Sequence, residues 1–308
     1  MHQSRTVALT VALVAILAAL AWWLLGGFPW AVSGFHLGPA ATGEDAGSGL
    51  DAIRMPLPLT VSALPSLVAL STIGGVCAGL LPIAVTHIPR PLAILEVCVV
   101  VLVTTAVTTA ISAHRVKSAS PGFGADDRVL VGLTLVVFAG TVVGLVLATV
   151  AITWHGATSV AAAVVAGLMP TWVHDLFAHG AGAGQAFARH AGDVAVAVVL
   201  GAGLIVSVRR TRAAMLGWPV ALAALWLTGP VITATAYLTA LLRPGSGLPD
   251  ALPEHLAAAR QVFGEAIRHT HPAYVPVVIA LIAGAAAAAY FTRTDDGGPT
   301  AGAPVRSG

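Results

Sequence analysis

Charged side chains are scarce in this sequence: Asp, Glu, Lys and Arg supply only 9% of its 308 residues. Soluble domains carry about 25% of such residues, so the low fraction excludes a soluble globular protein. The formal net charge is +2 and no stretch mixes basic with aromatic residues, which excludes nucleic acid as a partner. The basic residues are nearly all Arg, with Lys117 as the single lysine. With segments built mainly from Ala, Val, Gly and Leu, this bias is typical of a GC-rich genome and indicates an actinobacterial source.

Cysteine and catalytic motifs are also sparse. The two cysteines, Cys77 and Cys98, both fall in apolar segments, where a thiol behaves as a small hydrophobic side chain, so we expect them to stay unpaired. The sequence contains no G-x-S-x-G, no H-E-x-x-H and no G-x-x-x-x-G-K-S/T. Intramembrane enzymes can use scattered residues, so an enzyme is unsupported here rather than excluded. We predict no catalytic residues, no cofactor and no metal site.

Apolar residues, in contrast, are abundant: 57% of the chain is hydrophobic and its mean hydropathy is +0.90. A helix needs about 20 apolar residues to cross a membrane, and a helical bundle satisfies its own backbone hydrogen bonds where no water can. The alternation expected for strands is absent. Apolar segments recur at residues 7–25, 57–85, 92–112, 129–153, 159–177, 194–208, 213–242 and 274–291. We therefore predict an all-α fold, a polytopic transmembrane helical bundle of about eight segments, as one domain over residues 1–292.

The stretches outside these segments differ in character. Residues 26–54 are rich in Gly, Ala, Ser and Pro, which indicates an extracytoplasmic loop. In residues 250–269, Leu256, Phe263 and Ile267 recur at helical spacing opposite charged side chains. This pattern predicts one amphipathic helix at the membrane interface, with packing on the protein's own loops as the alternative. Residues 293–308 are rich in Gly, Pro and Asp, which predicts a disordered cytoplasmic tail.

Arginines between the segments predict an orientation. With eight crossings, both termini share one side of the membrane with the Arg-Arg-Thr-Arg turn at residues 209–212, Arg90 and Arg293. The positive-inside rule then places both termini in the cytoplasm, with the chain in the inner (plasma) membrane. The basic residues between positions 115 and 128 do not fit, because they would face outward.

A second arrangement removes that misfit. If the second and fifth segments entered the membrane and returned on the same side, the basic connection would also become cytoplasmic. Pro65 and Pro82 interrupt residues 57–85, and Pro170 interrupts residues 159–179. Interrupted segments at corresponding places in two halves are typical of transporters, although Pro is also common in ordinary membrane helices.

Polar side chains within the apolar segments are the candidates for function. Glu96 is the sharpest of them, because a carboxylate in a membrane span is costly and usually faces a partner or a cavity. It follows Pro91 closely, so it could also reach the headgroups or pair with Arg90. Thr105 and Thr108 belong to a hydroxyl stripe farther along the same segment, for which helix packing is favoured over a conduction path.

The end of the fifth segment carries a second polar group, formed by His174, Asp175 and His179. Asp175 and His179 are spaced i, i+4 and share a helix face. They could form a proton relay or supply two metal ligands, but no third ligand stands at a local spacing. Interfacial hydrogen bonding is the simpler interpretation.

Glycine and tryptophan lead to two structural predictions. The motifs Gly75-x-x-x-Gly79 and Gly140-x-x-x-Gly144 indicate close contacts between helices. Tryptophans at or near segment ends are expected to anchor the protein at the membrane interface. These are Trp22, Trp23, Trp30, Trp154, Trp172 and Trp218.

Residues 49–61, Gly-Leu-Asp-Ala-Ile-Arg-Met-Pro-Leu-Pro-Leu-Thr-Val, close a loop of small residues and lead into a Pro-containing segment. This stretch resembles the corresponding part of actinobacterial multi-pass proteins of the streptophobe type. It is also similar to the PerM group of envelope and division-associated membrane proteins. The resemblance implies a polytopic membrane protein and brings no catalytic motif with it.

These features favour a non-catalytic accessory or scaffold protein of the actinobacterial cell envelope. The alternative is a transporter or lipid-handling protein that uses the interrupted segments around residues 57–85 and 159–179, with Glu96 and Asp175 as its polar elements. Membrane lipids are the expected partners, and other membrane proteins are further candidates.

Overall fold

The computed structural model describes residues 2–32, 35, 54–84, 88–119, 127–154, 156–177, 183–241, 252–269 and 274–296. The regular structure in these ranges is helical, which confirms the predicted all-α class. The α-helices are α1 (His2–Ala21), α2 (Phe28–Val32), α4 (Leu64–Gly79), α5 (Arg90–Ala119), α6 (Asp127–Thr153), α7 (Ala157–Phe177), α8 (Ala183–Arg210), α9 (Trp218–Leu241), α10 (Leu252–His269) and α11 (Tyr274–Asp296). A π-helical turn, η1 (Trp22–Gly26), and 3-10 turns η4 (Val61–Ala63), η5 (Leu81–Ile83) and η6 (Arg212–Gly217) join some of them.

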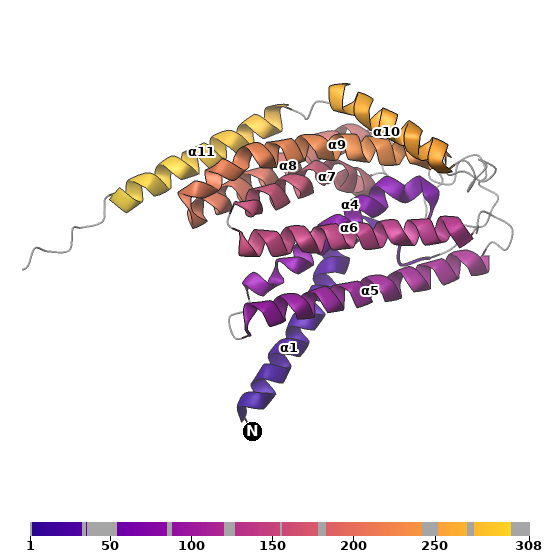
Figure 1. Ribbon diagram of the computed structural model, residues 1–308, viewed down its shortest axis with the longest axis horizontal. Helices are drawn as coiled ribbons and strands as arrows, with labels where there is room; N and C mark the ends of the chain where they lie inside the picture. The colour runs from indigo at the N-terminus through magenta and orange to yellow at the C-terminus, as the bar shows by residue number, and fades with distance from the viewer. Residues whose placement is uncertain are drawn as a thin grey trace, which may run out of the picture.

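Seven of these segments are long and apolar enough to cross a membrane, and a shorter apolar helix covers Thr10–Gly26. The chain is therefore a multi-pass membrane protein by helix length and hydropathy, as the eight apolar segments predicted. Figure 1 shows α5 to α9 running along the long axis of the molecule, with α1 crossing them at a steep angle. Helix α11 continues to Asp296, so the first residues of the predicted disordered tail are helical. Residues 297–308 lie outside the described ranges.

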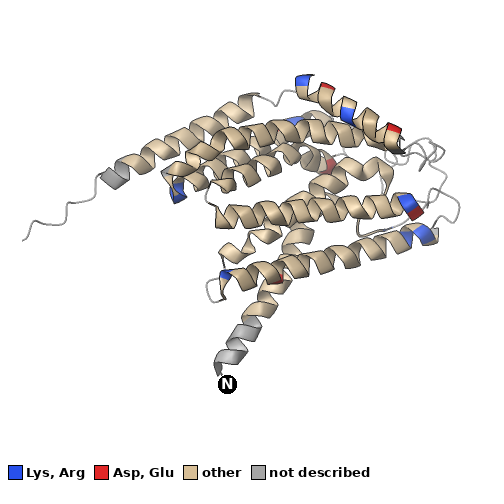
Figure 2. Cartoon of the chain, viewed as in Figure 1, with Lys and Arg blue, Asp and Glu red and all other residues tan. Residues whose placement is uncertain are grey.

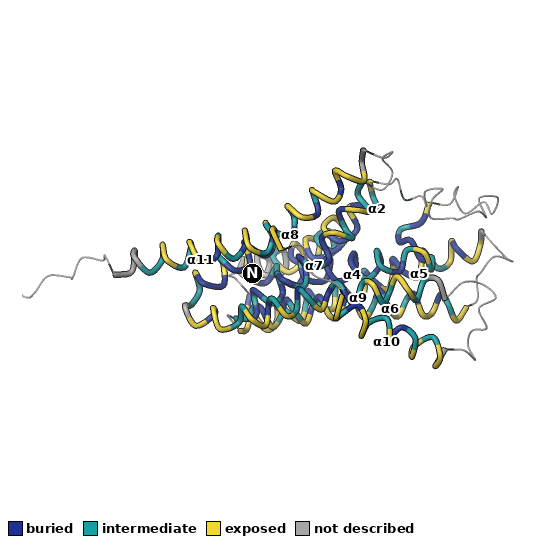
Figure 3. Tube along the Cα trace, turned by 90° about the horizontal axis from the view of Figure 1, so that it is seen from above, coloured by how far each residue is buried: buried dark blue, intermediate teal, exposed yellow. Residues whose placement is uncertain are grey.

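Helix α4 lies at the centre of the bundle. Its span is 67% buried inside the protein, whereas the other six long spans are 17–44% buried. Figure 3 shows the buried residues gathered along the middle of the bundle, where α4 lies. The helix has no charged residue and is apolar on all sides, which is the pattern of a fully buried helix. It contributes to both hydrophobic cores, through Leu67 to the core shared with α1, α5 and α6 and through Ile73 to the core shared with α7, α8 and α9.

The two glycine motifs bring α4 and α6 into backbone contact. A Cβ atom placed on Gly75 would lie 2.6 Å from the Thr141 carbonyl oxygen, and one on Gly144 would lie 2.4 Å from the Thr72 carbonyl oxygen. Real side chains do not tolerate such distances, so only glycine fits at these two places. The predicted close contact is confirmed, and the motifs of the two helices face each other.

The second and fifth segments do not turn back on themselves, and here the dipping arrangement is wrong. The Leu57 backbone N–H donates to Ser112 Oγ near the end of α5 at 2.8 Å, whereas α5 begins at Arg90. Because about 33 Å of helix separates Ser112 from Arg90, the chain between Leu57 and α5 must cross the bundle. Helix α7 is continuous from Ala157 to Phe177 through Pro170.

The first segment is the one that breaks. Helix α1 passes into η1, and α2 follows after Gly27. The Trp172 indole N–H lies 3.0 Å from the Leu25 carbonyl oxygen and 3.2 Å from that of Gly26, so α7 satisfies acceptors that the break releases. Gly26 is buried and α2 is helical, which corrects the prediction of a loop starting at residue 26. Residues 33, 34 and 36–53 of that predicted loop lie outside the described ranges.

Lys and Arg gather at the two ends of the long helices (Figure 2). One end holds Arg90 and Arg210, and the Arg210 guanidinium donates to the Ala151 carbonyl oxygen at 3.2 Å. The other end holds Lys117, which pairs with Asp127 at 2.5 Å. Since basic residues stand at both ends, the orientation of the chain in its membrane stays a prediction.

Candidate functional site

The sequence-predicted polar residues do not converge on one site. Glu96 lies in the second turn of α5, near the end of the bundle that holds Arg90. Asp175 lies in the last turn of α7, which ends at the opposite end because α5, α6 and α7 alternate in direction (Figure 1). His174 is exposed on α7, and His179 lies outside the described residues. A shared cavity for Glu96 and Asp175 is therefore not formed.

Glu96 is half-buried, and its Oε1 atom is buried without a hydrogen-bond partner among the described residues. A buried carboxylate oxygen without a donor is unfavourable in a span. This isolation is the strongest sign of chemistry on α5, and the sequence pattern had pointed to the same residue.

The hydroxyls of Thr105 and Thr108 donate to carbonyl oxygens of their own helix, α5. Thr105 Oγ1 donates to the Val101 carbonyl oxygen at 2.8 Å, and Thr108 Oγ1 donates to the Thr104 carbonyl oxygen at 2.7 Å. Both threonines are buried. Thr108 also accepts a long hydrogen bond, of 3.4 Å, from the Trp23 indole. Since these protons are used within the helix, the stripe matches the packing interpretation.

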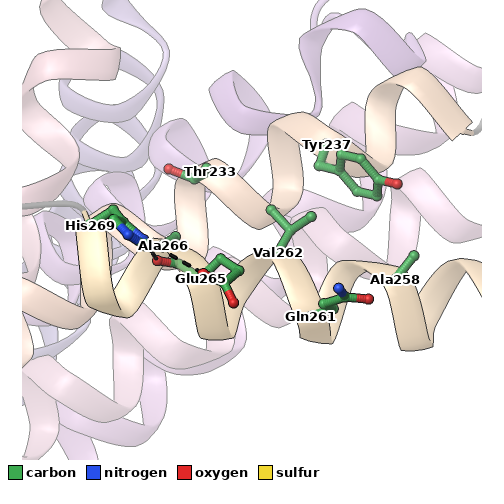
Figure 4. Close-up of a pocket in the computed structure, with 8 residues that line it drawn as sticks. All are labelled: Thr233, Tyr237, Ala258, Gln261, Val262, Glu265, Ala266 and His269. Carbon is green, nitrogen blue, oxygen red and sulfur yellow. Dashed lines mark hydrogen bonds and ion pairs between the residues drawn. The ribbon is translucent and has the colours of Figure 1, made fainter.

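A groove between α9 and α10 is the site that sequence reasoning missed. It has a volume of about 440 Å³. Figure 4 shows the side chains that line it. One turn of α9 forms one wall, and the second half of α10 forms the other. The lining residues are Thr233, Tyr237, Ala258, Gln261, Val262, Glu265, Ala266 and His269. The sequence placed Gln261 and Glu265 on the polar face of an amphipathic helix, but it contained no signal that this face meets α9.

Helix α10 is amphipathic as predicted, and it packs on the span α9 instead of on loops. Ala259 and Ala266 are buried, while Leu256 stays exposed. The rest of the apolar face is only partly covered, because Phe263 and Ile267 are half-buried.

Glu265 supplies the carboxylate of the groove, and two basic side chains of α10 lie near it. Glu265 Oε1 lies 3.4 Å from Arg268 Nη1, and Glu265 Oε2 lies 3.6 Å from His269 Nδ1. Both distances exceed the 2.7–2.9 Å typical of charge-assisted hydrogen bonds. His269 Nδ1 is closer to the Glu265 carbonyl oxygen, at 2.9 Å, so it carries a proton there. Among the described residues, the carboxylate of Glu265 thus makes weak, exposed ion pairs with Arg268 and His269.

No group of three or more His, Cys, Asp or Glu side chains comes together as a metal site in the described part of the chain.

The comparisons with known proteins identify no family for this sequence. No family model matches the sequence, and no curated protein or solved structure matches it either.

Proposed function

We propose that this chain is a non-catalytic accessory or scaffold protein of the actinobacterial cell envelope, of the streptophobe or PerM type, in the plasma membrane. The observation that supports this role is the filled centre of the bundle. Helix α4 occupies the place where a transporter would have its path, and its backbone touches that of α6 at Gly75 and Gly144. The buried hydroxyls of Thr105 and Thr108 are bonded within α5. Such an interior favours a rigid body that offers its outer surface to lipids and other membrane proteins.

The second candidate function is proton-coupled transport, and the isolated Oε1 atom of Glu96 favours it. The two functions differ in what happens to a pH gradient. A coupled transporter needs a carboxylate that takes up and releases a proton in the membrane, whereas a scaffold does not.

The test is the rate at which a pH gradient decays across sealed vesicles that contain the wild type or Glu96→Gln. We expect both proteins to insert at equal levels and the decay to match that of empty vesicles, because Glu96 lies only in the second turn of α5, close to the end of that span. A protein-dependent proton flux that Glu96→Gln abolishes would replace the scaffold role with transport. An exposed glutamate on α10, Glu254, supplies the control substitution Glu254→Gln.

Orientation follows from the same proposal, with both termini cytoplasmic. Single cysteines introduced at residues 3 and 300, in a chain with Cys77 and Cys98 replaced by alanine, should be protected from a membrane-impermeant thiol reagent in intact cells and labelled after lysis. Labelling of both residues in intact cells would contradict the cytoplasmic placement, and labelling of only one of them would contradict the even number of crossings.

A further inference from the structure

The exposed side of α6 is apolar over nearly the full length of the helix. No charged residue follows Arg128 in this helix, and its exposed large side chains from Val131 to Val150 are all apolar. At 1.5 Å per residue, about 38 Å separates Arg128 from Thr153. Helix α5 has the same length, about 38 Å, between Arg90 and Arg115. Both helices are therefore long enough for a hydrocarbon layer of ordinary thickness, which is about 30 Å.

The exposed side of α8 is much shorter. Its exposed large side chains are apolar from Val194 to Val206, but the exposed Asp193 directly precedes this stretch and the exposed Arg209 follows it. Only about 24 Å separates Asp193 from Arg209. An aspartate side chain is short, so it cannot extend to a distant headgroup layer as Lys or Arg can. The apolar length of α8 is thus about 14 Å less than that of α6.

The contacts of α8 show the height of Asp193 in the bundle. At one end of the molecule, Arg210 Nη1 donates to the Ala151 carbonyl oxygen near the end of α6. Farther along, a Cβ atom on Gly192 would lie 3.4 Å from Pro170 Cα, at a point about 20 Å into α7. Since α6 continues for about 38 Å from the same end, Asp193 lies level with the middle of α6.

The charged end of α10 lies at the same height. A Cβ atom on Gly217, directly before α9, would lie 2.7 Å from the Gly156 carbonyl oxygen, so α9 begins beside the start of α7. Thr233 is about 24 Å farther along α9, and Glu265 and His269 of α10 line the groove beside it. Figure 2 shows charged residues along α10, whereas those of α6 stand only at its first turn.

Helix α11 also begins at this height instead of at the end of the bundle. It runs parallel to α8, and a Cβ atom on Gly201 would lie 3.6 Å from Ala280 Cα. Tyr274, the first residue of α11, is about 9 Å before Ala280, and Asp193 is about 12 Å before Gly201. The start of α11 and Asp193 therefore differ in height by less than one helical turn.

A flat bilayer of ordinary thickness does not suit both sides of this molecule. If its hydrocarbon layer is centred on the apolar length of α6, Asp193 lies close to the centre of that layer. A carboxylate at that depth is strongly unfavourable. Beside an apolar surface that is too short, a bilayer becomes thinner at a modest cost.

We propose that the bilayer around this protein is locally thinner along α8, α10 and α11 than along α5 and α6. The headgroups of one leaflet descend to Asp193 and to the charged end of α10, and the amphipathic α10 lies at the lowered surface. The partner of this face is a phospholipid membrane whose shape the protein changes. This inference goes beyond the scaffold role and does not depend on it.

The test measures the depth of nitroxide labels by electron paramagnetic resonance, from their collisions with oxygen and with a water-soluble nickel chelate. Single cysteines replace Val142 of α6, or Val194 or Val206 of α8, which are all exposed. The full-length chain carries alanine in place of Cys77 and Cys98 and is reconstituted in vesicles of dioleoyl phosphatidylcholine. Thermal melting should show that the labelled proteins stay folded, because the labels sit on exposed positions.

The three labels distinguish thinning from the other arrangements. Val142 and Val194 are each about 17 Å from the Arg210 end of the bundle, so a flat bilayer would bury both labels deeply. Thinning should place the labels at residues 194 and 206 near the headgroups and the label at residue 142 about 10 Å deeper. A deep label at residue 194 would overturn the proposal. A shallow label at residue 194 with a deep label at residue 206 would also overturn it, because a tilted bundle in a flat bilayer gives that result.

A substitution tests whether Asp193 sets the level of the headgroups. Asp193→Leu extends the apolar side of α8 by about one turn toward Arg189, the preceding charged residue, so the label at residue 194 should become about 6 Å deeper. Glu254→Gln, at the far end of α10, is the matched control and should leave that depth unchanged. Equal depths in the wild type and Asp193→Leu would overturn the role given to Asp193.

Discussion

Replacing Gly144 with valine is expected to lower the free energy of unfolding of the detergent-solubilised protein by about 3 kcal/mol. The new Cβ atom would lie 2.4 Å from the Thr72 carbonyl oxygen and 2.8 Å from the Val76 backbone nitrogen. These are backbone atoms, which cannot move aside as a flexible side chain can. Helices α4 and α6 must therefore separate, and α4 is shared by both hydrophobic cores. Thermal melting and the yield of monodisperse protein measure the loss.

The matched control is Gly132→Val in the same helix. A Cβ atom on Gly132 meets nothing within 4 Å, and the residue is exposed. This variant should melt within a few degrees of the wild type, because the substitution changes only a lipid-facing surface. Equal stability of Gly144→Val and Gly132→Val would show that α4 and α6 do not pack at the glycine motifs.

Trp22→Ala is expected to destabilise the protein by about 3 kcal/mol. The Trp22 side chain is 1% exposed and its indole N–H donates to Thr141 Oγ1 at 3.3 Å, in the middle of α6. Removing the ring leaves a cavity where α1, α4 and α6 meet. Trp22→Phe keeps most of the volume and loses the hydrogen bond, so it should cost about 1 kcal/mol.

Trp154→Ala provides the comparison, because Trp154 is 68% exposed. The sequence pattern predicts the same role, that of an interfacial anchor, for both tryptophans. The structure corrects this for Trp22, which lies in the core. Near-equal effects of Trp22→Ala and Trp154→Ala on the melting temperature would instead restore the interfacial interpretation of Trp22.

The segments themselves could be predicted because hydropathy and periodicity are local properties of the chain. Apolar runs of sufficient length predicted every long helix of the bundle, and the spacing of Leu256, Phe263 and Ile267 predicted α10.

The positions of the prolines did not predict where a helix breaks. Pro170 is accommodated inside the continuous α7, whereas the first segment breaks at η1 and Gly27, where the sequence has no proline before Pro29. In a membrane bundle, a neighbouring helix can satisfy the backbone groups that a break exposes, as Trp172 does here.

Of the two candidate sites, one could be predicted from the sequence and the other could not. Glu96 was recognisable from sequence, since a single carboxylate in an apolar run is conspicuous at any depth. The groove was not, because α9 and α10 form it together, and no local pattern in the sequence shows that these two helices pack against each other.

By itself, the sequence determined that this is a helical membrane protein, how many apolar segments it has and which helix is amphipathic. Only the tertiary structure decided that α4 is the central helix, that Gly75 and Gly144 face each other, that Trp22 is buried and that α10 lies on α9. The reason is physical. Partition into lipid depends on the composition of each segment alone, whereas packing in lipid depends on the shape of two surfaces that meet.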